Sequence, residues 1–465
     1  MRNDEKMDTK ELLDLSKKTV KVALKKGADQ AQASSFLADR ALTRFANSQI
    51  HQNVASRTGG IIIKVVTKKK IGTLSVNTLN VEQIEDAVEK ALTIAKVTPP
   101  NKDFKSLPTP QKWSPIRGAH DPKTATCTPS FRADKVRDII QTAHSKSKHV
   151  KAVAGSYSTG ASSFAIANSL GVTAWAQMSL ASVNVTVISE VAGSQGFGSA
   201  EQYSRFVKEI DHIQAAEEAA EKSAKNVNHE KLAPGEYEVV LSPRAAATFV
   251  TFLSFMGFSA TTYQDGQSFV KYHLGEQVFD DKLSVKDDSR DPLTLYATPI
   301  DGEGVPKKPM KLIDKGVVSE KSICYDSFTA GKEKGKKSTG HSPPPMAGLF
   351  GPMRPVPINL IVRSGDASMD EMIEDTKHGI FVTRFHYTNP VDPTKAILTG
   401  LTRDGTFLIE NGQLSKPIMN LRYTDSMLSA LKDVPMMGKD LQRTSDSTTP
   451  SMKLRKLRFT GATQY

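Results

Sequence analysis

The chain alternates helical segments with groups of short β-rich runs, which leaves few options besides helices packed on antiparallel sheets. Apolar residues recur at helical spacing from Thr9 to Lys26 and again from Val81 to Lys96. Runs rich in β-branched residues, separated by polar turns, lie between and after these helices. The other expected helices cover residues 132–145 and 210–225, and the expected strands of this half cover 30–36, 42–49, 60–66, 71–76, 150–158, 163–167, 172–180 and 183–191. The pattern predicts an α+β fold.

Length and one Pro-Gly pair predict two mixed domains. A chain of 465 residues exceeds the size at which a single hydrophobic core stops growing. Pro234-Gly235 interrupts the pattern, and a strand-like run from Tyr237 to Leu241 follows at once. We expect an N-terminal domain of residues 1–231, with a sheet, helices and a Pro-rich internal connection at about 97–129, and a strand-rich C-terminal domain of residues 232–465.

The sequence shows no sign of a membrane segment or of a disulfide framework. No stretch approaches the roughly 18 apolar residues of a membrane span, and the first residues lack the apolar core of a signal peptide. The only cysteines, Cys127 and Cys324, form no CxxC pair, which argues against a thiolate zinc site. We therefore expect a cytoplasmic protein without a membrane contact.

The net charge of +12 does not by itself indicate nucleic-acid binding. Phosphate neutralisation needs clustered cations, and the basic residues here are largely dispersed. The densest runs cover residues 68–70, 332–337 and 453–458. We interpret all three as solvated turn, loop or edge charge, so a nucleic-acid partner is not favoured.

Two patterns in the sequence resemble motifs that carry chemistry, and a third such motif is absent. Residues 331–338 resemble a phosphate-binding loop, but the spacing is one residue short and prolines soon follow, which excludes the helix such a loop must open. Ser268 and Lys271 fit an S-x-x-K pair, and because triads cannot be read from sequence order, a serine hydrolase stays an alternative. The ten histidines are scattered and form no H-E-x-x-H group, so a self-contained zinc site is not expected.

Two stretches near the C-terminus carry a family resemblance. They read KHGIFVTRFHYTNP over residues 377–390 and LTGLTRDGTFLIENG over 398–412. Both resemble the TldD/PmbA family, and the PmbA (TldE) branch in particular. Further support is spread over the chain, at residues 169–171, 235–243, 301–306, 338–341 and 459–463.

The resemblance implies a chain without its own zinc site. In the catalytic TldD branch a helix bears H-E-x-x-x-H and a late cysteine adds a further ligand. An ungapped alignment on residues 239–243 places Thr251, Phe252 and Met256 at those helix positions, and residues 440–450 contain no thiol. A hydroxyl, a phenyl ring and a thioether cannot replace imidazole and carboxylate on zinc. We expect no catalytic residue and no cofactor in this chain, with zinc held by a TldD-type partner.

The same resemblance implies a non-catalytic subunit that pairs with a TldD-type zinc peptidase, the two enclosing a chamber in which unfolded peptides are cut. The working form is then a homo- or heterodimer. An extended peptide can add to a sheet edge, which singles out the run from Gly379 to Tyr387 and a Ser-Thr-Gly-His loop. The candidate peptide or partner contacts are Ser338, Thr339, Gly340, His341, Arg384, His386 and Tyr387. For these two segments the alternative is an ordinary core strand and surface loop. For the whole chain the alternatives are a stand-alone peptidase and a non-proteolytic gyrase modulator.

Overall fold

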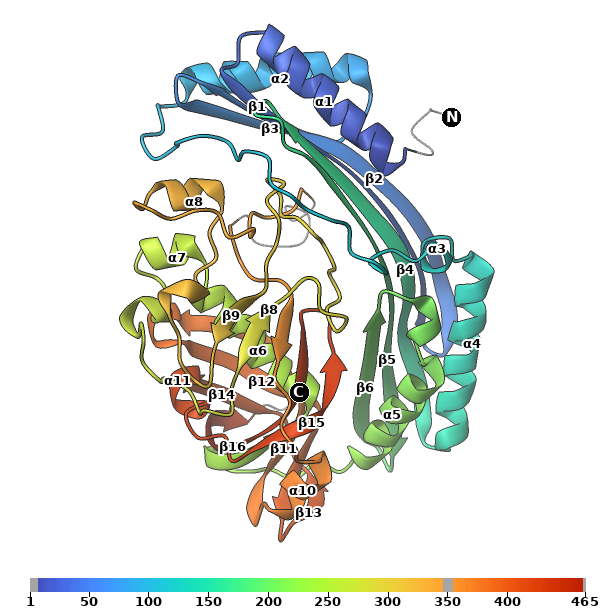
Figure 1. Cartoon of the computed structure of the whole chain (residues 1–465). Coiled ribbons are helices and arrows are strands. Elements are labelled where there is room, and N and C mark those ends of the chain that lie inside the picture. The colour runs from blue at the N-terminus through green and yellow to red at the C-terminus, as the bar shows by residue number, and fades with distance from the viewer. Residues whose placement is uncertain (1–6, 346–353, 463–465) are drawn as a thin grey trace.

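The computed structural model describes residues 7–345 and 354–462, and two sheets organise them (Figure 1). The first sheet has six strands in the order β3-β2-β1-β4-β5-β6, and the second has ten strands, eight of them in the order β13-β12-β11-β7-β16-β10-β8-β9. Helices accompany both sheets, so the α+β prediction is confirmed. All strands of the first sheet precede residue 205, whereas the second sheet begins at Gly235. We propose that each sheet forms the core of one domain, residues 1–231 and 232–465.

The elements before Gly235 are α1 (Thr9–Lys25), β1 (Gln30–Ala46), β2 (Gln49–Thr67), β3 (Lys70–Val76), α2 (Val81–Val97), α3 (Pro122–Ala125), α4 (Pro129–Lys146), β4 (Val150–Asn168), β5 (Thr173–Val191), β6 (Ser194–Ser204), η2 (Val207–Glu209) and α5 (His212–Lys225). Those that follow are β7 (Gly235–Leu241), α6 (Pro243–Gly257), α7 (Ala260–Gln264), η3 (Phe269–Tyr272), β8 (Val285–Asp287), β9 (Met310–Ile313), η4 (Glu320–Ser322), α8 (Ser327–Gly331), β10 (Leu360–Val362), α10 (Met369–Glu374), β11 (His378–Asp392), η5 (Pro393–Lys395), β12 (Ile397–Glu410), β13 (Gln413–Pro417), β14 (Leu421–Ser426), α11 (Met427–Ala430), β15 (Met436–Arg443) and β16 (Ser447–Ala462).

The strands of the first sheet are longer than the sequence predicts. The runs 30–36 and 42–49 were expected as separate strands, but β1 continues without a break from Gln30 to Ala46. Likewise β4 joins the runs 150–158 and 163–167, and β5 joins 172–180 and 183–191. β1 pairs with β2 on one side and with β4 on the other, so ladder hydrogen bonds carry it through residues of low strand propensity.

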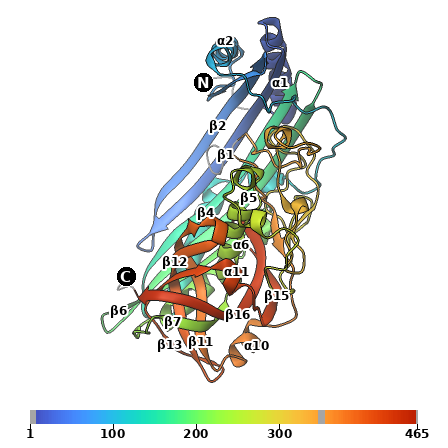
Figure 2. The same cartoon turned by 90° about the vertical axis from the view of Figure 1, so that its left-hand side faces the viewer.

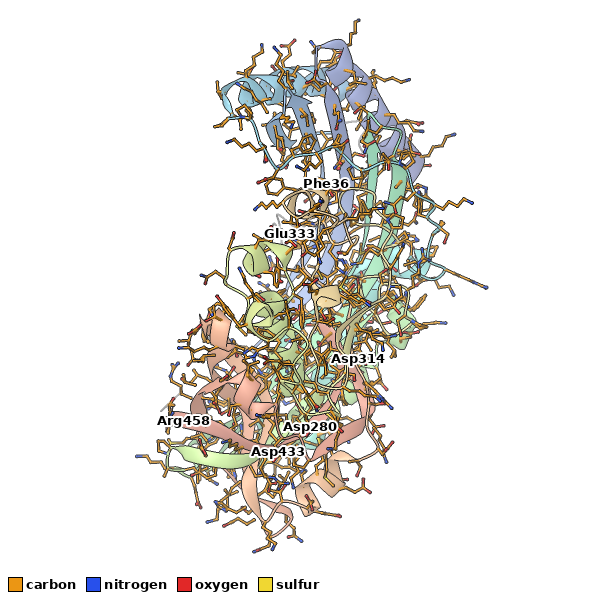
Figure 3. The ribbon with its side chains drawn as sticks, turned by 60° about the vertical axis from the view of Figure 1, so that its left-hand side comes forward. Phe36, Asp280, Asp314, Glu333, Asp433 and Arg458 are labelled. Carbon is orange, nitrogen blue, oxygen red and sulfur yellow. The ribbon has the colours of Figure 1, made fainter. Side chains whose placement is uncertain are left out.

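The two faces of the first sheet are covered by different partners. Helices α1 and α2 pack near one end of the sheet and α4 and α5 near the other, as Figure 1 shows. Alternate residues of a strand point to opposite faces, so Phe36, Phe164 and Ile166 form a separate cluster with Ile300 of the C-terminal half. Figure 2 shows the same curved sheet from the side, and Figure 3 labels Phe36 where the two halves meet.

The second sheet closes partly on itself around α6. Strands β7, β11, β12, β14 and β16 pair in a closed circuit, because β14 bonds both β12 and β16. Ser242 caps α6 by accepting from the Ala245 N–H, and Pro243 occupies its first turn. Phe249 stacks on Phe385 with ring centroids 4.8 Å apart. Most of α6 is buried, and its apolar side chains belong to the core of the C-terminal half.

The Pro-rich connection runs along the first sheet and has little regular structure apart from α3. Trp113 meets Trp175 edge to face at 5.7 Å, and the Leu107 N–H donates to the side chain of Gln30. In the described residues no helix is long and apolar enough to cross a membrane.

One basic run departs from the prediction of solvated charge. Lys453, in the middle of β16, is fully buried rather than exposed. Its Nζ lies 2.6 Å from Asp375 and 3.3 Å from Glu238. A buried ammonium group needs such carboxylate partners. The sequence of the basic run alone does not show which carboxylates lie beside it.

Candidate functional site

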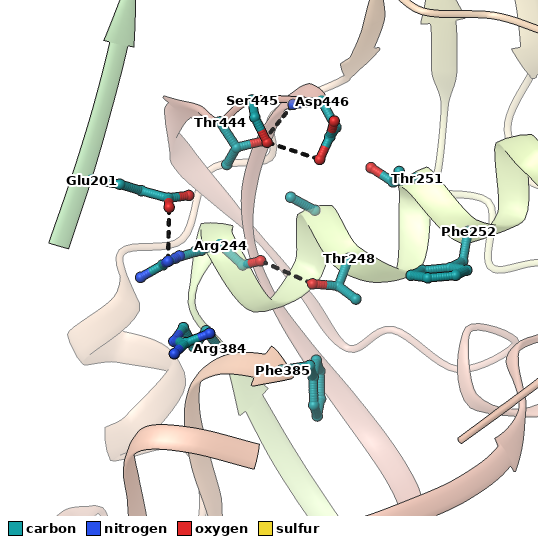
Figure 4. A pocket seen from close by; sticks show the side chains of 11 residues that line it. Glu201, Arg244, Thr248, Thr251, Phe252, Arg384, Phe385, Thr444, Ser445 and Asp446 are labelled. Carbon is teal, nitrogen blue, oxygen red and sulfur yellow. Dashed lines mark hydrogen bonds and ion pairs between the residues drawn. The ribbon is translucent and has the colours of Figure 1, made fainter. Parts of the chain in front are cut away.

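A pocket of about 150 Å³ lies where both halves of the chain meet beside α6. β6 contributes Glu201, α6 contributes five residues from Arg244 to Phe252, and β11 contributes Arg384 and Phe385. The turn between β15 and β16 closes it. The complete lining is Glu201, Arg244, Ala247, Thr248, Thr251, Phe252, Arg384, Phe385, Thr444, Ser445 and Asp446 (Figure 4).

Two arginines on one side of the pocket are each anchored by an acid. Arg244 Nη2 lies 2.7 Å from Glu201 Oε2, and its Nη1 donates to Ser199 Oγ at 2.8 Å. Arg384 places Nε 2.6 Å and Nη2 2.5 Å from one oxygen of Asp404. Burial lowers the pKa of Arg244, and the like charge of Arg384 lowers it further. The arrangement holds two guanidinium groups beside a small open volume.

Hydroxyls and one carboxylate line the opposite side. Ser445 Oγ donates to Asp446 at 2.8 Å, and Thr444 Oγ1 donates to the Ser447 carbonyl at 3.0 Å. Thr251 is only 8% exposed, yet its hydroxyl has no hydrogen-bond partner among the described residues. Buried hydroxyls normally have a hydrogen-bond partner. The Thr251 hydroxyl is therefore an exception in the pocket lining.

The structure brings only part of the expected H-E-x-x-x-H positions to this pocket. Thr251 and Phe252 line it, and the segment 440–450 supplies Ser445 to the same volume. Met256 instead packs in the core of the C-terminal half and is 3% exposed.

The Ser-Thr-Gly-His loop folds around a buried carboxylate, away from the pocket lining. His341 is fully buried, and its Nε2 lies 3.3 Å from Asp287, whose carboxylate also faces Lys307 at 3.6 Å. A carboxylate only accepts, so Nε2 carries the proton and Nδ1 accepts from Thr339 Oγ1 at 2.9 Å. Gly340 is also buried, at a φ of +80° that favours glycine, and Ser338 Oγ donates to the Tyr325 carbonyl.

The β11 candidates divide between the pocket and the surface. Arg384 lines the pocket, whereas Tyr387 is 73% exposed and His386 is half-buried beside it. Their rings lie 4.3 Å apart. Burial lowers the pKa of His386, and the charges of Arg384 and Arg403 lower it further, which favours the neutral imidazole.

The two rejected or alternative motifs have structural roles. Ser268 is fully buried and donates to the Gly257 carbonyl at 2.6 Å, while Lys271 Nζ lies over the Tyr263 ring. The loop at 331–338 follows the end of α8 and opens no helix among the described residues.

Sequence reasoning missed most of the pocket. Glu201, Arg244 and Asp404 were not singled out, although Asp404 lies inside the resembling stretch 398–412 and Arg244 directly follows the Ser-Pro start of α6. Among the described residues, no group of three His, Cys, Asp or Glu side chains is arranged to hold a metal.

Models of three consecutive domains of one family match the chain. They are the PmbA/TldA metallopeptidase domain 1 at residues 40–95, the central domain at 125–227 and the C-terminal domain at 234–461. The chain belongs to the TldD/PmbA family. This confirms the resemblance drawn from residues 377–412.

Relatives that are named metalloproteases align with most of this chain. A PmbA homologue of Haemophilus influenzae, named a metalloprotease, is 23% identical over 462 residues and covers 95% of this chain and 94% of its own. A metalloprotease of Methanocaldococcus jannaschii is 24% identical, covering 82% and 84% respectively. These names support a role in a peptidase family.

Solved structures share the fold. TldE from Thermococcus kodakarensis superposes with a TM-score of 0.88 at 18% identity, covering 96% of this chain and 100% of that one. A Thermotoga maritima protein described as a modulator of a DNA gyrase gives 0.84 at 22% identity, covering 96% and 99%.

The residues present do not fit the zinc ion that a metallopeptidase name implies. Of the three aligned positions, one supplies a hydroxyl, one a phenyl ring and one a core thioether. Zinc in proteins takes imidazole, thiolate and carboxylate ligands. The carboxylates that line the pocket are Glu201, which is paired with Arg244, and Asp446.

Proposed function

We propose that this chain is the non-catalytic, TldE-like subunit of a zinc metallopeptidase complex that acts on unfolded peptides in the cytoplasm. The observation that carries the proposal is the identity of the α6 side chains at the pocket. Thr251 and Phe252 stand where the family's metal ligand and base are expected, and neither can do that chemistry. The catalytic zinc would then be held by a TldD-type partner.

An exposed strand edge supports a partner contact. β3 pairs only with residues 61–67 of β2, so the edge of β2 from Gln49 to Ser56 has no neighbouring strand among the described residues. Ile50 and Val54 on this segment are 38% and 36% exposed. A long unpaired edge is a template for strand addition by another chain or peptide. We place the partner or a peptide along it.

The test compares the purified chain alone with a mixture that contains a TldD-type protein. We expect the chain alone to contain no stoichiometric zinc and to leave an unfolded peptide uncut, because its pocket lacks metal ligands. Cleavage that a chelator abolishes should appear in the mixture. Zinc content by elemental analysis and peptide cleavage by mass spectrometry provide the readouts.

Variants of the β2 edge sharpen the same experiment. Val54→Lys should weaken association with the partner by about ten-fold, because it places a solvated charge at the contact. Leu414→Lys on β13, where Leu414 is 41% exposed, is the matched control and should leave association unchanged. Chelator-sensitive cleavage by the chain alone would support the stand-alone peptidase instead, and a lack of cleavage in every mixture would favour the gyrase modulator.

Restoring the aligned residues should not create a peptidase. We expect the triple variant Thr251→His, Phe252→Glu, Met256→His to show no zinc-dependent cleavage, because position 256 lies in the core and residues 440–450 offer no thiol. Metal-ligating histidines also need hydrogen-bonded support from neighbouring groups. Cleavage and zinc content are measured together.

The double variant Thr251→His, Phe252→Glu keeps Met256 and is the folded control for this experiment. Its circular dichroism spectrum should match that of the unaltered chain. Robust zinc-dependent cleavage by either variant would contradict the prediction.

A further inference from the structure

The pocket beside α6 has chemistry that the proposed subunit role does not use. Arg384 binds Asp404 through Nε and Nη2, and its Nη1 takes no part in that ion pair. Arg244 lies close enough to Arg384 for their like charges to interact unfavourably. An anionic group placed between the two guanidinium groups would relieve that repulsion and would accept from planar N–H donors.

The opposite side of the pocket carries a carboxylate, whereas the first side carries two guanidinium groups. Asp446 is exposed and has no ion-pair partner within 4.0 Å in the described part of the chain, and its side chain accepts from the hydroxyl of Ser445. Figure 4 shows Asp446 across the pocket from Arg384, above the side that α6 forms. A cationic or N–H-bearing group is the complement of a lone carboxylate.

Thr251 points to a ligand independently of these charges. It is more than nine-tenths buried, and its hydroxyl has no partner among the described residues. In Figure 4 this hydroxyl is turned toward the side of the pocket where Asp446 lies. A buried polar atom is normally satisfied by a protein group, an ordered water or a bound molecule.

Size and wall chemistry limit what the ligand can be. The volume of about 150 Å³ is far below that of a pocket for a large cofactor. Phe252, Phe385 and Ala247 add apolar surface to the same pocket. The ligand is therefore short, carries opposite charges at its two ends and has an apolar side chain.

We propose that this pocket binds a zwitterionic dipeptide, with its carboxylate at Arg384 and Arg244, its ammonium at Asp446 and a polar backbone group at Thr251. The assignment rests on this chain's own residues and does not depend on a catalytic partner. The catalytic branch of the family is expected to bind its metal at this position. In this chain the same position would recognise a small peptide instead.

The test measures binding of L-alanyl-L-phenylalanine to the full chain, without a partner, by isothermal titration calorimetry. We expect one site per chain. The C-terminal amide and the N-acetyl derivative of the same dipeptide should each bind about ten-fold more weakly, because each removes one of the two charges. Equal affinity of either blocked form, or no binding of the free dipeptide up to about 10 mM, would overturn the assignment.

Three variants and a control locate the ligand. Arg384→Gln should abolish the preference for the free carboxylate, and Asp446→Asn the preference for the free ammonium. Thr251→Val removes a hydroxyl that has no partner, so it should weaken dipeptide binding without lowering the melting temperature. Thr251→Val therefore tests the site even if Arg384→Gln fails to fold.

Arg455→Gln is the matched control, since Arg455 is 56% exposed on β16 and pairs with Glu238 outside the pocket lining. It should bind the dipeptide as the unaltered chain does. Unchanged affinity in both Thr251→Val and Asp446→Asn would place the dipeptide elsewhere and refute the site.

Discussion

Replacing Asp287 with alanine should lower the free energy of unfolding by about 3–5 kcal/mol, because the change leaves a buried positive charge without its partner. Asp287 on β8 is completely buried. One carboxylate oxygen accepts from the backbone N–H groups of Ile358 and Asn359, at 2.9 and 2.7 Å. The other lies 3.6 Å from Lys307 and 3.3 Å from His341. Alanine removes every one of these acceptors.

The pKa of Asp287 agrees with this role. Burial alone would raise that pKa, but the charge of Lys307, the His341 ring and the Asn359 N–H outweigh it and hold the pKa well below the usual range. A lowered folded-state pKa contributes stability that is present above the ordinary aspartate pKa and is lost as the pH falls below it. The loss in Asp287→Ala should therefore be full at pH 7.

Urea unfolding followed by circular dichroism measures the effect. Asp287→Asn keeps one acceptor oxygen but loses the charge, so it should fall between the unaltered chain and the alanine variant. Asp314→Ala is the control, because Asp314 is half-exposed and its contact with Lys311 is a surface pair worth about 0–1 kcal/mol. A loss of under about 1 kcal/mol in Asp287→Ala would contradict the argument.

Helices were predictable within a few residues because their signals are local. The apolar spacing predicts helices over 9–26 and 81–96, and the structure has α1 at Thr9–Lys25 and α2 at Val81–Val97. Strand lengths were not predictable from local sequence, since pairing on both edges extends β1 and β4 through weak segments. A strand is as long as its neighbours allow.

β6 was missed for a related reason. Its sequence, SQGFGSAEQYS, is rich in Ser, Gly and Gln and carries little strand propensity. A Cβ at Gly198 would meet the Ala219 carbonyl at 2.2 Å, so this glycine permits the close approach of α5 to the strand. Close packing of a helix, rather than β-branched residues, explains this strand.

Only a small part of the pocket was predictable. Thr251 and Phe252 could be placed because the family resemblance aligns residues 239–243 without gaps and so fixes their positions on α6. Glu201 and Asp446 could not, because the pocket assembles four segments that are distant in the sequence. The Ser-Thr-Gly-His loop was predicted to contact a peptide or partner because of its polar residues. In the structure His341 of this loop is buried and contacts an internal carboxylate.

The contact between the two halves should weaken as the pH rises, and Asp301 is the group responsible. Asp301 and Glu303 are each only 3% exposed and belong to one tight loop at the junction. The loop holds the first sheet through the Gly302 carbonyl, which accepts from Gln32 at 3.3 Å, and through Glu303, 3.7 Å from Lys64. Burial first, and then the neighbouring charge of Glu303, raises the pKa of Asp301 to about 7.

The sign of the effect follows from linkage. A raised folded-state pKa contributes stability that is fully present below the ordinary aspartate pKa and is lost as the pH rises toward 7. At about 1.4 kcal/mol for each pKa unit, Asp301 should remove roughly 2–3 kcal/mol of stability between pH 5 and pH 8. Asp301→Asn cannot titrate, so the stability difference between the unaltered chain and this variant should fall by that amount.

Comparing the two proteins cancels the opposite contributions of groups such as His341, whose pKa burial lowers. Urea unfolding at pH 5, 6, 7 and 8 gives the difference at each pH. Asp314→Asn provides a matched control, because Asp314 is half-exposed and its difference from the unaltered chain should stay constant. If the Asp301→Asn difference is also constant within about 0.5 kcal/mol, Asp301 is charged at every pH tested. The backbone N–H groups of Glu303, Val305 and Ser342, which donate to Asp301, must then stabilise its charge beside that of Glu303.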